Sequence, residues 1–259
     1  MKQAVLRHYD EKYAAEEAGA RPEPVALTPT PTDRFEAAVS GVHARFTGGR
    51  VLEIGAGSGR VARALLATGL ACEGYTATDL STHRLAGMRA SIDDPRVEVR
   101  RFDLDDPDPS LEGQFDAVLL VALIEHVFDP LRALATVRRL LRPGGFALID
   151  TPNIAKYTRR LKLLLGRFPS TASLNEGLLT YDGRPVDLHD EGHLHYFTFR
   201  SLEKLLLERC GFARIERVPY ATPPFLGAPA LAYRLAARWP TLFSELCVVA
   251  YAPEAPLER

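Results

Sequence analysis

Strand-like and helix-like patterns alternate along most of this chain, and that alternation is what most restricts its possible folds. Short apolar runs rich in β-branched residues are typical of strands, and helical periodicity follows each of them. Parallel strands joined by helices form a sheet that is covered on both faces. The expected strands lie within residues 50–55, 72–79, 97–103, 115–127, 146–153, 213–219 and 243–253. The pattern predicts an α/β, doubly wound, Rossmann-like sheet.

The domain organisation follows from where this alternation begins and where it is interrupted. Residues 1–32 read as a charged helix and a proline-rich connector, which we expect to act as an N-terminal lid. Residues 33–259 then form one domain, starting with a helix that Asp33 caps. Residues 154–197 contain no clean strand–helix unit, so we interpret them as an insert after the fifth strand.

Composition argues against several classes of protein. The net charge is −1 over 259 residues, so no overall field favours nucleic acid or a membrane surface. Cys72, Cys210 and Cys247 are far apart, which argues against a disulfide framework or a zinc knuckle. The N-terminus has no apolar leader, and no run is long enough to span a bilayer. We expect a cytoplasmic, bacterial protein.

A glycine-rich stretch, "EIGAGSG", lies between the first strand and its helix. Gly55, Gly57 and Gly59 permit a tight turn and a close approach of the backbone to a ligand. The helix behind them offers unpaired N–H groups. Asp79 ends the next strand, where a carboxylate suits the two hydroxyls of a ribose. The pattern predicts a cofactor that contains a nucleoside.

The spacing of the glycines separates the candidate cofactors. A dinucleotide site has the pattern GxGxxG and holds a pyrophosphate, whereas this chain has GxGxG. Glu53 precedes the loop, and a carboxylate there would repel a pyrophosphate but attract an ammonium group. An NAD-dependent oxidoreductase is therefore disfavoured.

Five stretches in order carry a family resemblance: "VLEIGAGSG", "TATDLS", "RRFDLDD", "VALIEHVFDP" and "LRPGGFALIDTPN". With them the chain resembles the class I S-adenosylmethionine-dependent methyltransferases, of the type that acts on small molecules. The resemblance covers about residues 50–152 and is weaker beyond. It implies a seven-stranded, mostly parallel sheet with a final antiparallel strand. It also implies S-adenosylmethionine as cofactor and S-adenosylhomocysteine as product.

The resemblance also implies roles for individual residues. Gly55, Gly57 and Gly59 would line the methionyl part of the cofactor, and Glu53 would hold its ammonium group directly or through water. Asp79 would bind the ribose. The remaining cofactor contacts would come from Leu80 on the adenine, Asp103 on the adenine amino group, Leu104 on its ring, Val121 beside the sulfonium, and His126 and Tyr13 closing the site.

The methyl acceptor should lie where the loop after the fourth strand meets the insert. His126, in "IEHV", is a candidate general base, because imidazole titrates near pH 6.5; it could equally hold its loop in place. The role of the neighbouring Glu125 is equally open. The insert carries five basic residues between Lys156 and Arg167 and no acid. They either form a solvated face or recognise an anionic acceptor.

The stretch "VDLHDEGHLHYFT" leaves three interpretations open. It could position the loop, or it could supply an acceptor-binding residue or a base from His189 or His193. It could also hold a divalent metal ion. That site, possible but not favoured, would use Asp187, His189, His193 and His195.

These observations favour transfer of a methyl group to a hydroxyl of a small molecule, a sugar or a specialised metabolite, with an anionic or glycosidic acceptor as one option. The alternatives are N- or C-methylation, and a non-catalytic module that binds S-adenosylmethionine and regulates a partner. We expect a monomer or a homodimer that binds neither nucleic acid nor membrane.

Overall fold

A computed structural model describes residues 24–172, 189–222 and 228–255. Tyr13 and the expected lid, and Asp187 in the insert, lie outside these residues. The described chain folds around a single seven-stranded sheet with the order β3-β2-β1-β4-β5-β7-β6. The expected number of strands is therefore confirmed, and so is the doubly wound order, which reverses between β1 and β4.

The strands match the sequence pattern closely. β1, β2, β3, β4 and β5 are parallel, whereas β7 runs antiparallel between β5 and β6, as the resemblance implied. Their bounds are β1 Arg50–Ile54, β2 Gly74–Asp79, β3 Val97–Arg101, β4 Phe115–Val121, β5 Leu141–Thr151, β6 Arg214–Arg217 and β7 Leu246–Tyr251. β5 starts earlier than expected, since the turn "RPGG" is part of the strand.

Several helices begin where the sequence offers a capping side chain. Asp33 accepts hydrogen bonds from the N–H groups of Phe35 and Glu36, and Thr198 forms a capping box with Ser201. The helices are α2 Arg34–His43, α3 Arg60–Ala67, α4 Thr82–Ser91, α5 Pro130–Leu140, α6 Tyr157–Leu164, α7 Phe199–Glu208, α8 Pro229–Arg238 and α9 Pro240–Phe243. Two 3-10 turns, η1 Pro109–Leu111 and η2 His189–Gly192, complete the elements.

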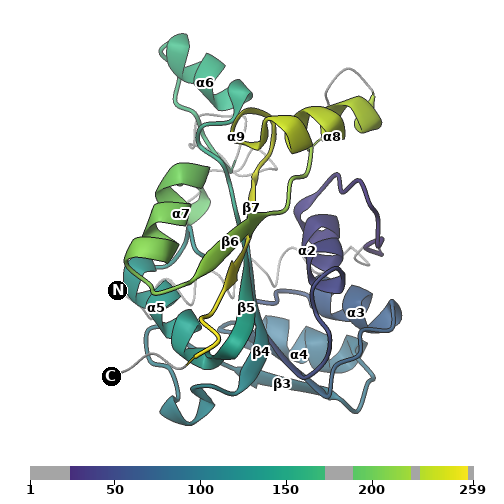
Figure 1. Ribbon diagram of the computed structural model, residues 1–259. Helices are drawn as coiled ribbons and strands as arrows, with labels where there is room; N and C mark the ends of the chain where they lie inside the picture. Colours follow the sequence, from purple (N-terminus) through teal and green to yellow (C-terminus); the bar gives the residue numbers. More distant parts are fainter. Residues whose placement is uncertain (1–23, 173–188, 223–227, 256–259) are drawn as a thin grey trace.

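Two hydrophobic clusters hold the sheet between its helices. One packs α2, α3 and α4 against the first face, and the other packs α5 and α7 against the second (Figure 1). Within β1 the side chains alternate between them, with Val51 in the first and Leu52 in the second. Helices α6, α8 and α9 gather beyond the end of the sheet (Figure 1).

The strand order also locates the ligand site. Ligands of open α/β sheets bind beyond the carboxyl ends of the strands, where the strand order reverses. Here that point is between β1 and β4, so the loops after Ile54 and Val121 face each other across it. Among the described residues, no helix is both long and apolar enough to cross a lipid bilayer.

Candidate active site

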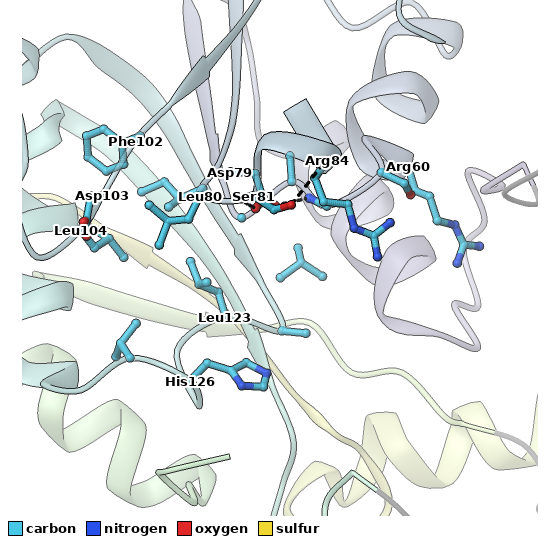
Figure 2. Close-up of a pocket in the computed structure, with 18 of the residues that line it drawn as sticks. Arg60, Asp79, Leu80, Ser81, Arg84, Phe102, Asp103, Leu104, Leu123 and His126 are labelled. Carbon is cyan, nitrogen blue, oxygen red and sulfur yellow. Dashed lines mark hydrogen bonds between the residues drawn. The ribbon is translucent and has the colours of Figure 1, made fainter. Parts of the chain in front are cut away.

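A cavity of about 400 Å³ lies beyond the carboxyl ends of β1, β2 and β4. It is lined by residues 54–58, 79–81, 102–105 and 121–123, together with Arg34, Phe35, Arg60, Arg84 and 126–128. In Figure 2, Phe102, Asp103 and Leu104 lie at one end, whereas Arg60 and Arg84 lie at the other. The cavity therefore has an apolar end and a positively charged end.

The glycines of the loop have different structural roles, as a comparison of Gly57 with Gly59 shows. All have positive φ angles: +70° at Gly55, +58° at Gly57 and +75° at Gly59. A Cβ at Gly59 would come within 2.9 Å of Ile92, and Gly59 does not line the cavity. A Cβ at Gly57 would meet nothing within 4 Å, and Gly57 does line it. Gly57 therefore leaves room for a ligand, while Gly59 permits close packing.

Replacing Gly57 with alanine should weaken cofactor binding. The added methyl group enters the cavity, and overpacking of this kind costs about 1–3 kcal/mol, or about 10- to 100-fold in affinity. Gly113 is the matched control, because its φ is +64°, its Cβ would also meet nothing, and it lies outside the cavity. Both variants should lose about 1–2 kcal/mol of folding stability from backbone strain. Titration with S-adenosylhomocysteine should distinguish them; equal affinities would contradict this interpretation of Gly57.

Asp79 ties the glycine loop to the next strand. Its Oδ2 accepts a hydrogen bond from the Gly57 N–H at 3.0 Å, and its Oδ1 accepts one from the Ser81 N–H at 2.9 Å. Burial raises the pKa of this carboxyl above its ordinary value, although these hydrogen bonds oppose the shift. Asp79 lines the cavity with its remaining lone pairs available to a polar ligand, which matches its expected place.

Phe102, Asp103 and Leu104 lie together at one end of the cavity (Figure 2). Phe102 and Leu104 are almost fully buried, and they flank Asp103, whose Oδ1 accepts the N–H of Asp105 at 3.0 Å. Leu80 and Val121 also line the cavity. All four residues expected near the adenine and the sulfonium therefore lie on the cavity wall.

Glu53 lies behind the wall of the cavity, and its expected contact with the cofactor's ammonium group, directly or through water, stays a prediction. It does not line the cavity, and its Oε2 accepts a hydrogen bond of 2.6 Å from the hydroxyl of Tyr75. Burial raises the pKa of Glu53 to about 7. The carboxylate therefore bonds β1 to β2 beneath the loop, and the structure shows no direct path from it to a ligand in the cavity.

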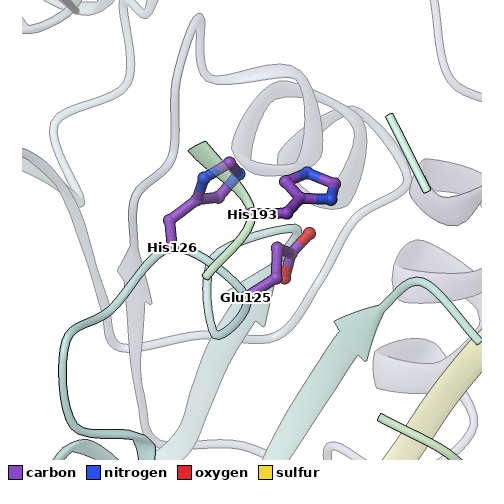
Figure 3. A group of neighbouring side chains, drawn as sticks. All are labelled: Glu125, His126 and His193. Carbon is purple, nitrogen blue, oxygen red and sulfur yellow. The ribbon is translucent and has the colours of Figure 1, made fainter. Parts of the chain in front are cut away.

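A second group of polar side chains adjoins the cavity. Glu125, His126 and His193 each offer one oxygen or nitrogen atom, and these atoms lie within 4.8 Å of one another (Figure 3). We call these three residues the His–Glu cluster. The rings of His126 and His193 meet edge to face, with 4.7 Å between their centroids. Because His126 also lines the cavity, the cluster and the cavity share a residue.

Backbone and side-chain bonds fix the cluster's geometry. The N–H groups of Leu194 and His195 donate to the carbonyl of Glu125 at 2.8 and 3.2 Å. His126 Nδ1 lies 3.2 Å from the carbonyl oxygen of Gly192, which can only accept, so Nδ1 carries the proton. These bonds connect the loop after β4 to the segment before α7, some 66 residues away.

The histidines of the stretch "VDLHDEGHLHYFT" make contacts in different places. His193 belongs to the His–Glu cluster, whereas His195 Nε2 contacts the carbonyl of Phe128 at 3.2 Å. The metal site expected from Asp187, His189, His193 and His195 stays a prediction, because Asp187 lies outside the described residues. The side chain of His189 lies outside them. Asp190, in a left-handed conformation with φ +49°, is fully buried and accepts hydrogen bonds from Ser170, Thr171 and Tyr196.

Two buried acids lie near the site. The sequence analysis left the role of Glu125 undecided and gave Asp150 no role. Burial raises the pKa of Glu125 to about 7, and its Oε2 accepts the hydroxyl proton of Thr151 at 2.8 Å. Burial also raises the pKa of Asp150 to about 6; this residue accepts a bond from Tyr220 and lies 3.9 Å from Arg34. Both residues stand in the stretches "VALIEHVFDP" and "LRPGGFALIDTPN", but nothing in these stretches indicates that the two carboxyl groups are buried.

Glu245, which is distant in the sequence, neutralises part of the positive charge of the insert. Lys156 Nζ and Arg159 Nη1 lie 3.1 and 2.6 Å from the carboxylate of Glu245, and all three side chains are nearly buried. These charges hold the start of the insert against β7, so they do not form a solvated face. An anionic acceptor would therefore have to be recognised by the other basic residues of the insert.

Replacing Glu245 with glutamine should lower the free energy of unfolding by about 3–5 kcal/mol at pH 7, because two buried cations lose their partner. Burial alone would raise the pKa of Glu245, but the cations beside it lower this pKa to about 2, below its ordinary value of 4.5. Its stabilisation is therefore complete above about pH 4.5 and is lost as the pH falls through about 2. Urea denaturation should show the difference between the two proteins narrowing over that range.

The half-exposed Glu216, which pairs with Arg45, provides the control. Its replacement with glutamine should cost at most about 1 kcal/mol. Equal effects of the two substitutions would show that the buried pairing of Glu245 has no special importance.

Comparisons with known proteins agree with this geometry. A family model described as a methyltransferase domain matches residues 32–217. The ubiquinone biosynthesis O-methyltransferase of Xanthomonas oryzae pv. oryzae is 32% identical over 133 residues, which are 49% of this chain and 51% of that protein. That of Alkalilimnicola ehrlichii is 36% identical over 110 residues, 41% and 42% of the two chains. The chain thus spans about half the length of the curated relatives it matches.

Solved structures show the same fold. An S-adenosylmethionine-dependent methyltransferase from Mesorhizobium loti has a TM-score of 0.56 at 22% identity, covering 85% of this chain and 98% of its own. Phosphoethanolamine N-methyltransferase 2 of Haemonchus contortus, solved with S-adenosylmethionine, has a TM-score of 0.54 at 18% identity, covering 83% and 52%. With a family model spanning most of its length and a glycine-loop cavity at the sheet's switch point, the chain belongs to the S-adenosylmethionine-dependent methyltransferases of the Rossmann-like fold.

Proposed function

We propose that this protein transfers the methyl group of S-adenosylmethionine to a hydroxyl group of a small molecule. The observation that supports it best is the position of His126, which lines the glycine-loop cavity and also belongs to the His–Glu cluster. A donor site and a group able to accept a proton thus lie side by side. The names of the curated relatives, which are O-methyltransferases, point the same way.

The cavity suits the cofactor at four points. The apolar side chains of Phe102 and Leu104 suit an adenine ring, with Asp103 beside its amino group. The open space at Gly57 admits a ligand against the backbone, and Asp79 lies where a ribose would present its hydroxyls. The arginines at the opposite end supply positive charge for the cofactor's carboxylate (Figure 2). Bound there, S-adenosylmethionine supplies a methyl group attached to a positively charged sulfur.

The protein's own contribution to the reaction is alignment and removal of a proton. A hydroxyl oxygen attacks a methyl group far better once its proton is leaving, so a base within reach lowers the barrier. The Nδ1–H of His126 is directed to the Gly192 carbonyl, which puts the basic lone pair of the ring on Nε2. We assign His126 the role of general base, with His193 as its neighbour at the acceptor. His189 stays a candidate on sequence grounds.

The acceptor is proposed to lie beside the His–Glu cluster. Thr171 and Tyr196, in the described part of the insert, add hydroxyl groups near the cluster, and both bond to Asp190. Such a mixture of hydroxyls, imidazoles and carboxylates suits a polar acceptor, such as a sugar or a hydroxylated specialised metabolite. Proximity and orientation then account for most of the rate enhancement.

Two measurements test the proposal. Calorimetric titration should show binding of S-adenosylhomocysteine and no binding of NAD; the reverse result would overturn the cofactor assignment. Incubation with methyl-labelled S-adenosylmethionine and a panel of sugars, phenols and amines should then label hydroxyl oxygens. Labelling of amines alone would make the protein an N-methyltransferase. Cofactor binding without transfer to any member of a broad panel, or of a cell extract, would favour a regulatory module.

A further inference from the structure

We propose that Glu125, His126 and His193 form a binding site for one divalent transition-metal ion. Their potential ligand atoms already lie within 4.8 Å of one another, on two segments that are far apart in the sequence (Figure 3). Two imidazoles and one carboxylate are a ligand set that suits zinc, iron(II), manganese(II) or cobalt(II). Three protein ligands leave at least one coordination position open.

The state of Glu125 is an independent indication of a cation. Its side chain is 99% buried, and its Oε2 is bonded to Thr151. Among the described residues, its Oε1 has no hydrogen-bond partner. A buried carboxylate oxygen without a donor is costly, and native structures usually have an explanation for it, such as an ion. An ion held by the two neighbouring imidazoles would satisfy this oxygen.

The partners of the two imidazoles are of the kind that metal-bound histidines have. Metal-bound histidines usually donate their other N–H to a carbonyl, a carboxylate or a similar acceptor. His126 does so to the carbonyl of Gly192. His193 Nδ1 lies 2.6 Å from Thr171 Oγ1, and that hydroxyl lies 3.0 Å from Asp190 Oδ2. The carboxylate can only accept the hydroxyl proton, so Oγ1 accepts the Nδ1–H of His193, and both rings keep a basic Nε2.

The place of the site suggests what the ion does. His126 lines the cofactor cavity, so an ion held by this residue would lie beside the bound cofactor. Coordination of a hydroxyl oxygen to a divalent cation lowers the pKa of that hydroxyl. This part rests on the proposed function and refines it: with the ion bound, the two imidazoles act as ligands, and the coordinated hydroxyl loses its proton to solvent water. The oxygen then forms the bond to the methyl group as the carbon–sulfur bond breaks and S-adenosylhomocysteine leaves.

The site is tested by binding of the metal alone. Protein stripped with EDTA and dialysed is titrated with Co²⁺ under calorimetry and visible absorption. We expect one equivalent to bind, with a visible band from nitrogen and oxygen ligands. Glu125→Gln and His193→Ala should each weaken binding by at least about 100-fold, since outer partners of a ligand alone are worth about 10- to 100-fold. His193→Gln replaces His193→Ala if that variant does not fold.

His195→Ala is the matched control. His195 is only two residues from His193, but its ring contacts the Phe128 carbonyl and is not part of the cluster. This variant should bind Co²⁺ like the wild-type protein. The proposal would be overturned if the wild-type protein bound no Co²⁺. It would also be overturned if Glu125→Gln and His193→Ala both bound Co²⁺ as tightly as the wild-type protein does.

The same preparations separate this inference from the proposed function. If the protein binds no Co²⁺ in the titration but the stripped protein transfers methyl groups at the wild-type rate, the metal site is excluded and the methyltransferase assignment stands. One equivalent of Co²⁺ bound through the cluster, with no transfer to any hydroxylated acceptor, would leave the metal site and remove O-methylation.

Discussion

Replacing Asp79 with alanine is expected to weaken the binding of S-adenosylhomocysteine by about 100-fold or more. A carboxylate that accepts two ribose hydroxyls makes two hydrogen bonds to a charged group, each worth about 1.5–3 kcal/mol. Their loss corresponds to a factor of about 100 to 10,000 in the dissociation constant. Isothermal titration of the wild-type protein and the variant measures this directly.

A second variant separates the ribose contact from support of the loop. Asp79 also accepts the N–H groups of Gly57 and Ser81, so its loss affects the glycine loop itself. Asp79→Asn keeps one acceptor oxygen for these bonds but loses the negative charge, and its affinity should lie between those of the wild-type protein and Asp79→Ala. A folded Asp79→Ala protein that binds within about threefold of the wild type would show that the ribose is held elsewhere.

Replacing His126 with alanine is expected to lower the turnover of methyl transfer by about 100- to 10,000-fold, the usual contribution of a general acid or base. The affinity for S-adenosylhomocysteine should change little, because the cofactor's main contacts are assigned to the glycine loop and Asp79. His193→Ala should behave in the same way. Initial rates with labelled S-adenosylmethionine, measured at saturating cofactor, provide the comparison.

His195→Ala is again the informative neighbour, because it removes an imidazole of the same motif that is not in the cluster. Its turnover should stay within about threefold of the wild type. Wild-type turnover in both His126→Ala and His193→Ala would exclude these two histidines from the chemistry.

The fold was predictable because its signals are local. Most strands of the parallel core are apolar runs that end at a turn or a cap, and Asp33 starts its helix as expected; Ser81 and Thr198 start theirs with the same kind of side chain. The cofactor cavity was predictable for the same reason: its parts come from strand ends, whose positions follow from the order of the strands. The hydrogen bond from Tyr75 to the carboxylate of Glu53 was not predictable in this way, because it joins side chains of two strands.

The acceptor region was less predictable because its contacts join distant segments. Glu245 pairs with Lys156 across 89 residues, and this depends on β7 lying beside β5. Similarly, nothing in the stretch around His193 indicates that its partners would be Glu125 and His126. Periodicity reports which way a side chain faces within its own element, not which other segment it will meet.

The shared position of His126 has one further consequence, for how the two ligands influence each other. A ligand that holds this ring from the cavity side changes the free energy with which anything binds on the cluster side. Thermodynamic linkage requires that the effect be reciprocal and of equal size. Donor and acceptor affinities are therefore expected to be coupled, so that each must be measured in the presence as well as the absence of the other.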